Sequence, residues 1–276
     1  MKIDLRVLKT ELKRAFDTPG FLIALLIGFG CVFYKNYWLI LHDYEIYKAY
    51  NKLGGYSNLN ASSFYDRWMI GYLDSSILYV FYFLGIIASL PYGISYFKDK
   101  KNGIIKNICT RCEKKKYLLS KYITVFTVGG VASAFPIVLD LLMANLYQPY
   151  DTMRIEGSVL SGRNEWLMVI IDNPYICAVV IVFLWFLFGG ALATISLMIS
   201  VVADNVFTIQ LTPFFVMLAL FYIPSAIPAK YNHYFPFYFL SVFGESNPII
   251  AIVISFIIIG LSFLTFMFFE NRKDIL

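Results

Sequence analysis

Charge is scarce in this 276-residue chain. Only 15% of its residues are Asp, Glu, Lys or Arg, whereas 59% are hydrophobic. Soluble domains are about a quarter charged and contain less apolar sequence. The mean hydropathy of +0.67 agrees with this imbalance. The composition therefore excludes an ordinary soluble domain and predicts an integral membrane protein.

Residues that bind metals or form disulfides are also few. The chain has four cysteines and two histidines. Cys109 and Cys112 form a lone Cys-x-x-Cys in a basic segment, while His42 and His233 are expected on the opposite side of the membrane. A structural zinc site takes four ligands. We therefore expect no metal site, and no disulfide framework either.

Sequence motifs for catalysis are missing as well. The chain contains no glycine-rich loop ending in Gly-Lys-Ser/Thr, no serine-nucleophile motif and no paired-histidine metal motif. We therefore expect no catalytic residue, no cofactor and no nucleic-acid partner. If ATP powers this protein, a separate subunit must bind the nucleotide and its magnesium.

Long apolar runs dominate what remains. A helix needs about 20 residues to cross the hydrocarbon core, and a β-barrel would require short alternating strands instead. Unbroken runs such as 249–269 favour helices. The expected spans are 21–41, 75–97, 122–147, 175–202, 207–227 and 248–269. The predicted fold is an all-α integral membrane protein with six transmembrane helices in a single domain, 1–276.

The first 17 residues predict an amphipathic helix at the membrane surface. Apolar side chains recur on one face at spacings of three and four: Leu5, Leu8, Leu12 and Phe16. Basic residues occupy the rest of its circumference, as expected for a helix lying among anionic head groups. Pro19 should end this helix, because the residue before a proline avoids the helical region.

The distribution of basic residues predicts the orientation. The N-terminal segment, the segment 98–121 and the C-terminal tail together carry sixteen Lys and Arg, against six in the segments on the other side. Cytoplasmic loops are enriched in these residues. Both termini are therefore expected in the cytoplasm of a plasma-membrane protein, with 98–121 as a cytoplasmic loop and 42–74 and 148–174 as extracellular loops.

A proline-rich aromatic segment separates the last two spans. Pro224, Pro228 and Pro236 interrupt a run of tyrosines and phenylalanines. The segment is too apolar for a solvated loop and has too many prolines for one straight helix. It predicts a broken outer hairpin, re-entrant or interfacial.

Two charged residues fall inside the expected spans. Lys35 lies near the outer end of the first span, where its side chain can reach the surface. Asp140 lies deeper, about seven residues from the outer end of the third span. It is expected to make a polar contact between helices or, alternatively, to line a substrate path.

The cytoplasmic segment 98–121 contains a distinctive pattern. Asn102-Gly103 is a turn signal, and Ile104, Ile105 and Ile108 form one apolar edge of a short helix after it. A solvated basic loop would not need these isoleucines. The edge predicts a contact with the membrane surface or with a partner protein.

The segment resembles the type-2 family of ABC transporter permeases. The resemblance rests on Asn102-Gly103, the apolar stretch, the basic cluster and the Tyr117-Leu-Leu-Ser-Lys entry to the third span. The usual Gly-Thr-x-Arg reads Gly-Ile-Ile-Lys here, which keeps a cation but loses a hydroxyl. The resemblance implies that the ATPase subunit contacts Ile104, Ile105, Asn107 and Ile108. It implies a second contact at Asp204 and Asn205.

The function implied is that of a membrane-spanning ABC transporter subunit that exports a hydrophobic or amphipathic cargo, such as a peptide or lipid-like molecule. Its partners would be an ABC ATPase dimer, a second permease copy or paralogue, and membrane lipid. Two alternatives remain open from the residues. One is an ion-coupled secondary transporter, and the other is an intramembrane enzyme or signalling subunit.

The missing phosphate-binding loop leads to a direct prediction. The purified chain alone should release no phosphate from ATP above the background of a mock preparation, because no segment matches a nucleotide cradle. A colorimetric phosphate assay on the detergent-solubilised chain measures this. Sustained hydrolysis that follows the chain through a second purification step would contradict the prediction.

Overall fold

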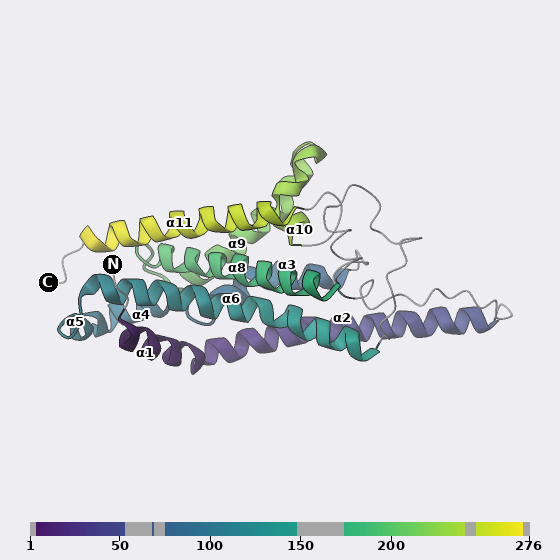
Figure 1. Ribbon diagram of the computed structural model, residues 1–276, viewed down its shortest axis with the longest axis horizontal. Coiled ribbons are helices and arrows are strands. Elements are labelled where there is room, and N and C mark those ends of the chain that lie inside the picture. Colours follow the sequence, from purple (N-terminus) through teal and green to yellow (C-terminus); the bar gives the residue numbers. More distant parts are fainter. Residues whose placement is uncertain (1–3, 53–67, 69–74, 148–173, 241–246, 273–276) are drawn as a thin grey trace.

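The protein is built from helices. A computed structural model describes residues 4–52, 68, 75–147, 174–240 and 247–272, and this part contains no strand. The long helices run along the long axis of an elongated bundle, and the two chain termini lie at the same end (Figure 1). The helices and short helical turns are α1 Leu5–Phe16, α2 Pro19–Lys52, α3 Ser75–Ser89, α4 Ser95–Lys101, α5 Ile104–Cys109, α6 Lys114–Tyr147, α8 Pro174–Ile199, α9 Val206–Tyr222, η2 Ile223–Ala226, η3 Ala229–Tyr234, α10 Pro236–Phe239 and α11 Pro248–Arg272.

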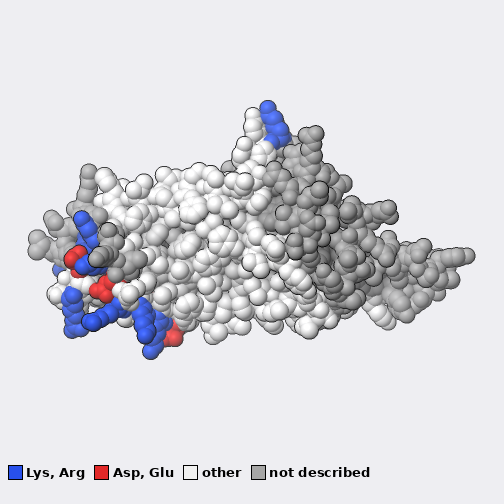
Figure 2. All heavy atoms as spheres, in the orientation of Figure 1, with Lys and Arg blue, Asp and Glu red and all other residues white. Residues whose placement is uncertain are grey.

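Five helical segments in this part are long and apolar enough to cross a membrane. They are Pro19–Trp38, Lys114–Leu146, Tyr175–Ile199, Val206–Ala226 and Pro248–Glu270. α3 is equally apolar in character but has only 15 residues. Figure 2 shows an uncharged middle and a charged end at α1, α4 and α5. The chain is therefore an all-α membrane protein, as its composition predicts.

The N-terminal helix forms and stops where the sequence predicts. Asp4 caps α1 by accepting a hydrogen bond from the backbone N–H of Arg6. The helix ends at Phe16, and α2 starts at Pro19, whose fixed φ suits a first helical position. The apolar stripe is less simple than expected, because Glu11 and Ala15 are the buried residues of α1 while Leu5 and Phe16 are exposed.

The second expected span is broken rather than continuous. α3 ends at Ser89, and a turn over 90–94 leads into α4. Pro91 has no N–H and cannot continue the helix. Its carbonyl instead accepts a hydrogen bond of 2.9 Å from the Thr18 hydroxyl, which joins the turn to the α1–α2 junction. The span expected at 75–97 is wrong in this respect.

Two further boundaries differ from the sequence reading. α2 has 34 residues and would be about 51 Å long, which exceeds a hydrocarbon core of about 30 Å. Residues 42–52 are therefore helical, although the sequence placed them in a loop. α6 starts at Lys114, so the segment 98–121 is mostly helix as well. The remainder of the two expected outer loops, 53–67, 69–74 and 148–173, lies outside the described residues.

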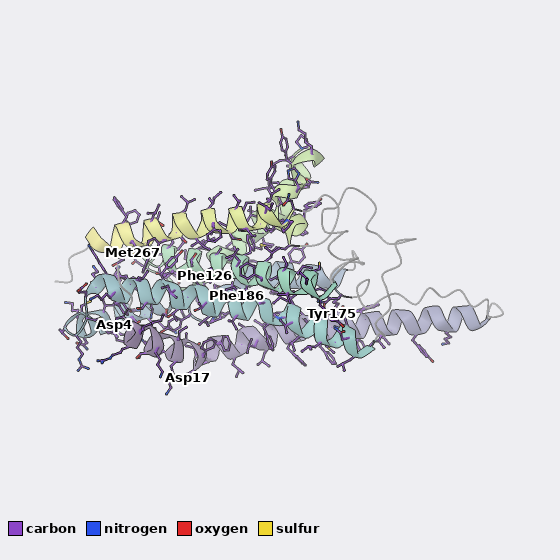
Figure 3. All side chains as sticks on the ribbon, in the orientation of Figure 1. Asp4, Asp17, Phe126, Tyr175, Phe186 and Met267 are labelled. Atoms are coloured by element: carbon purple, nitrogen blue, oxygen red, sulfur yellow. The ribbon has the colours of Figure 1, made fainter. Side chains whose placement is uncertain are left out.

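Small residues bring α6 and α8 together. A Cβ atom placed on Gly129 would lie 2.3 Å from the Cβ of Ala193, and one placed on Gly189 would lie 2.2 Å from the Cβ of Ser133. The rings of Phe126 and Phe186 cross at this contact, 5.7 Å apart (Figure 3). Small residues permit such close approach in lipid, where helices associate by packing rather than by the hydrophobic effect.

Hydroxyl groups join α11 to the same pair. Tyr122 on α6 donates a hydrogen bond of 2.8 Å to the Ile259 carbonyl and lies 2.8 Å from the Ser262 hydroxyl. Thr194 on α8 lies 2.8 Å from the same Ser262 hydroxyl. All three side chains are buried and satisfy one another's hydrogen-bonding groups. They fix which face of α11 meets the bundle.

The segment between α9 and α11 is broken, as its prolines predict. It forms η2, η3 and α10, and η2 and η3 project sideways from the bundle (Figure 1). Ile223, Ile227, Tyr231 and Tyr234 are exposed there. This exposure favours the interfacial form of the hairpin over the re-entrant form, because exposed irregular backbone does not occur within the hydrocarbon region.

The α6–α8 contact predicts a steric effect of one methyl group. Gly129→Ala should lower stability by about 1–3 kcal/mol, because the new Cβ meets Ala193 and lies 2.8 Å from the backbone oxygen of Ala88. Gly260→Ala is the matched control, since a Cβ on Gly260 meets nothing within 4 Å. The control should be neutral or slightly stabilising. Unfolding midpoints in detergent measure both, and equal midpoints for the two variants would contradict the packing account.

Candidate partner-docking site at the charged end

Basic side chains cover the end of the molecule formed by α1, α4 and α5 (Figure 2). The exposed cations of this end are Arg6, Lys9, Lys13, Arg14, Lys98, Lys100, Lys101, Lys106, Arg111 and Lys115. Such a surface suits anionic head groups or an acidic partner. Beneath it lies a second set of charges, three of which are buried.

Lys121 is the centre of this buried set. Its side chain is 0% exposed. Its Nζ atom lies 2.8 Å from Oε2 of Glu11 and 2.5 Å from Oδ2 of Asp99. The three residues come from α6, α1 and α4, so one ammonium group joins three helices. We call Lys121, Glu11, Asp99 and Arg14 the ionic cluster.

Arg14 closes the ionic cluster on its exposed side. Its Nη1 lies 2.9 Å from Oε1 of Glu11, and its Nη2 lies 2.9 Å from Oδ1 of Asp99. Two cations therefore balance two carboxylates. Tyr92 and Tyr117 complete the hydrogen bonding by donating to Glu11 at 2.7 Å and to Asp99 at 2.9 Å. A buried charge is tolerated when it is paired and hydrogen-bonded in this way.

The electrostatics of Asp99 reflect these partners. Burial alone would raise the pKa of its carboxyl group. The positive charge of Lys121 and the hydrogen bonds that the carboxylate accepts outweigh burial and lower the pKa. Asp99 therefore stabilises the folded chain at every pH above the ordinary aspartate pKa of about 3.9. This contribution is lost as the pH falls through the lower folded value.

The pattern that predicted a docking helix forms a helix in the structure. Gly103 precedes α5 with a φ of 69°, a left-handed conformation that glycine adopts without strain. Ile105 is 8% exposed and packs on the core of its own chain, so the three isoleucines do not form one exposed edge. Ile104 and Ile108 are half-buried, while Asn107 is exposed.

Asp204 and Asn205 lie in the exposed turn between α8 and α9. The Asn205 side chain accepts a hydrogen bond of 3.0 Å from the backbone N–H of Phe207. Asn205 is therefore the N-cap of α9, which explains an asparagine at this position without any partner. The side chain of Asp204 stays exposed at this turn.

Asp140 lies far along α6 from the ionic cluster and makes its own ion pair. It contacts Nζ of Lys35 at 2.5 Å and accepts a hydrogen bond of 3.1 Å from Asn36, both on α2. Lys35 and Asp140 are each 4% exposed. The expectation that Lys35 reaches the surface was wrong, because a carboxylate on the neighbouring helix supplies a closer partner than head groups do.

The cysteines show no metal chemistry in the described part of the chain. Cys31, Cys109, Cys112 and Cys177 are free thiols. No group of three His, Cys, Asp or Glu side chains there is placed to hold a metal ion. Burial raises the pKa of the Cys109 thiol, which disfavours its reactive thiolate.

Comparison with protein-family models, curated proteins and solved structures gave no match to this chain.

The ionic cluster predicts a large effect of removing one charge. Lys121→Met should weaken the docking of α1 on α6 by about 3–5 kcal/mol, because it leaves two buried carboxylates with Arg14 as their remaining cation. Lys115→Met, on the exposed face of the same helix, is the control and should change little. Amide hydrogen exchange of α1 measures both.

A second substitution tests whether the charge itself is responsible. Glu11→Gln in the Lys121→Met background removes one of the two carboxylates that share Arg14 and should restore part of the protection of α1. If Lys121→Met leaves the exchange of α1 unchanged, the cluster does not hold this helix.

Proposed function

We propose that the chain is the membrane-spanning subunit of an ABC transporter, driven by a separate ATPase dimer that docks on α5. The observation that carries the proposal is the connection of α5 to the membrane helices. α5 lies between α4, which supplies Asp99, and α6, which supplies Lys121. A partner that pushes α5 would therefore move the start of α6 directly.

The link to the membrane is stiff for a physical reason. The ionic cluster cannot open without separating two buried carboxylates from the Lys121 ammonium group. A second contact ties the end of α11 to the same place, because Nζ of Lys114 donates to the Glu270 carbonyl at 2.5 Å. Force applied at α5 is therefore transmitted to α1, α6 and α11 together.

The remaining parts of the proposal follow from the sequence pattern. α3 would supply a sixth span. The positive end would face the cytoplasm, so that both termini lie inside a plasma membrane. Two permease copies, or one copy and a paralogue, would enclose the path. The apolar spans and aromatic outer segment favour export of a hydrophobic peptide or lipid-like cargo. The exposed side chains of Asn107 and Asp204 would contact the ATPase.

One observation supports an ion-coupled secondary transporter as a second candidate. Asp140 and Lys35 form a buried ion pair inside the membrane region. Buried carboxylates in transmembrane segments often belong to proton or ion paths. In this candidate, transport would stop when the ion gradient collapses and would continue without ATP.

An experiment on the exposed face of α5 separates these readings. The tagged chain, purified in mild detergent from its own host, should bring an ATPase subunit with a phosphate-binding loop. Asn107→Arg should reduce the recovered ATPase about tenfold, because it adds bulk and charge at the centre of the proposed contact. Asn107 is exposed, so the substitution does not disturb the core of this chain. Ile105 is unsuitable for this test, since it belongs to the core of its own chain.

Thr10→Arg is the matched control, because Thr10 is an exposed polar residue at the same end but on α1. It should retain the ATPase. Recovery of equal ATPase with Asn107→Arg and the control would contradict docking on α5. Transport that ignores ATP depletion and follows an ion gradient would favour the second candidate.

A further inference from the structure

A cavity of about 300 Å³ lies beside the ionic cluster. The α1–α2 junction, the turn between α3 and α4 and the start of α9 enclose it. Its walls are apolar and include Leu90, Pro91 and Ile94. Arg14, Lys98 and Gln210 line it with polar groups from three different segments of the chain.

These polar groups still have hydrogen-bond donors that no residue of the described part uses. Within the described residues, the Lys98 ammonium group has no ion-pair or hydrogen-bond partner, and it is exposed. The backbone carbonyl of Gln210 accepts from Ser89, but its side-chain amide has no partner in the described part. Arg14 is 40% exposed and uses three of its five N–H groups on Glu11 and Asp99.

The charge balance of the cavity favours an anion. Asp99 also lines it, but its carboxylate is 2% exposed and is neutralised by Lys121 and Arg14. Since the ionic cluster carries two charges of each sign, Lys98 leaves the site with a net positive charge. An anion placed there would meet the free ammonium, the remaining guanidinium N–H groups and an amide donor.

The position of the cavity narrows the choice of anion. Its lining comes from the charged helices α1 and α4 and from the starts of the apolar helices α2 and α9. Phe207, one turn before Gln210 on α9, is an exposed apolar side chain. A free phosphate ion has no apolar surface to bury against Leu90, Pro91 and Ile94. A phosphate attached to hydrocarbon would gain binding free energy by burying that hydrocarbon there.

We propose that this cavity binds the head group of an anionic phospholipid, with the phosphate at Lys98 and Arg14 and the glycerol and first methylene groups against Leu90, Pro91 and Ile94. The bound lipid would brace the α1–α2 junction against the α3–α4 turn. The proposal does not depend on an ATPase partner. It requires only that the charged end lies at a membrane surface.

Native mass spectrometry of the full chain in detergent tests the proposal. Phosphatidylglycerol should bind about tenfold more tightly than phosphatidylcholine with the same acyl chains. Lys98→Gln should weaken phosphatidylglycerol binding about fivefold, the factor expected for one surface cation near an anionic head group. Lys101→Gln, three residues along the same helix and not lining the cavity, should leave binding unchanged. Both substitutions are exposed, and equal melting temperatures establish that both variants are folded.

Three results would overturn the proposal. Equal affinities for the two lipids would show that the head-group charge is not recognised. Equal losses in Lys98→Gln and Lys101→Gln would show a general surface attraction rather than a site. Displacement of phosphatidylglycerol by millimolar soluble glycerol phosphate would show that the site takes a free phosphate and not a lipid. Preference for the anionic lipid, lost in Lys98→Gln alone, would support the site.

Discussion

The ammonium group of Lys121 is fully buried, and the arrangement of helices at the charged end depends on its need for partners. An isolated buried charge would be too costly, so carboxylates from α1 and α4 must meet it, and Arg14 must in turn neutralise the second negative charge. Tyr92 and Tyr117 take up the remaining hydrogen-bonding capacity. Because these partners come from separate helices, satisfying one charge fixes the position of α1, the turn between α3 and α4, and the start of α6. The position of α5 and the cavity beside Arg14 both follow from this arrangement.

The middle of the bundle is held by different forces. Burial of apolar surface gives little net attraction between helices that already lie in lipid, so close packing and side-chain hydrogen bonds must hold them together. α6 and α8 use glycine, alanine and serine to approach closely, and α11 joins them through Tyr122, Thr194 and Ser262. α2 is held to α6 by the ion pair of Lys35 and Asp140. Each contact is specific in register, because a shift by one residue would remove the small side chain or the hydroxyl from its partner.

α6 carries a polar anchor near each end. Lys121 and Asp140 are 19 positions apart in the sequence, which corresponds to about 28 Å of helix and matches a hydrocarbon core of about 30 Å. The two ion pairs therefore lie near the two borders of the apolar layer, where a charged group costs less than at the centre. α6 is therefore joined at these two positions to α1 and α4 and to α2. In the proposed function, these contacts would transmit a push at α5 along α6.

The sequence alone determined the class of the protein, the position of most helices, the break before Pro19 and the irregular segment before α11. These features depend on local chemistry: apolar length, proline geometry and glycine at a left-handed turn.

Only the tertiary structure decided which charges are buried. Glu11 shares a helical face with Leu8, Leu12 and Ala15, and an acidic residue on an apolar face is a signal that a cation must meet it. The sequence cannot name that cation, because Lys121 is 110 residues away and looks like one more residue of a basic loop. Lys35 and Asp140, 105 residues apart, were separated in the same way. The side on which Ile105 packs is also a tertiary property, since a six-residue helix presents apolar residues to its own core as readily as to a partner.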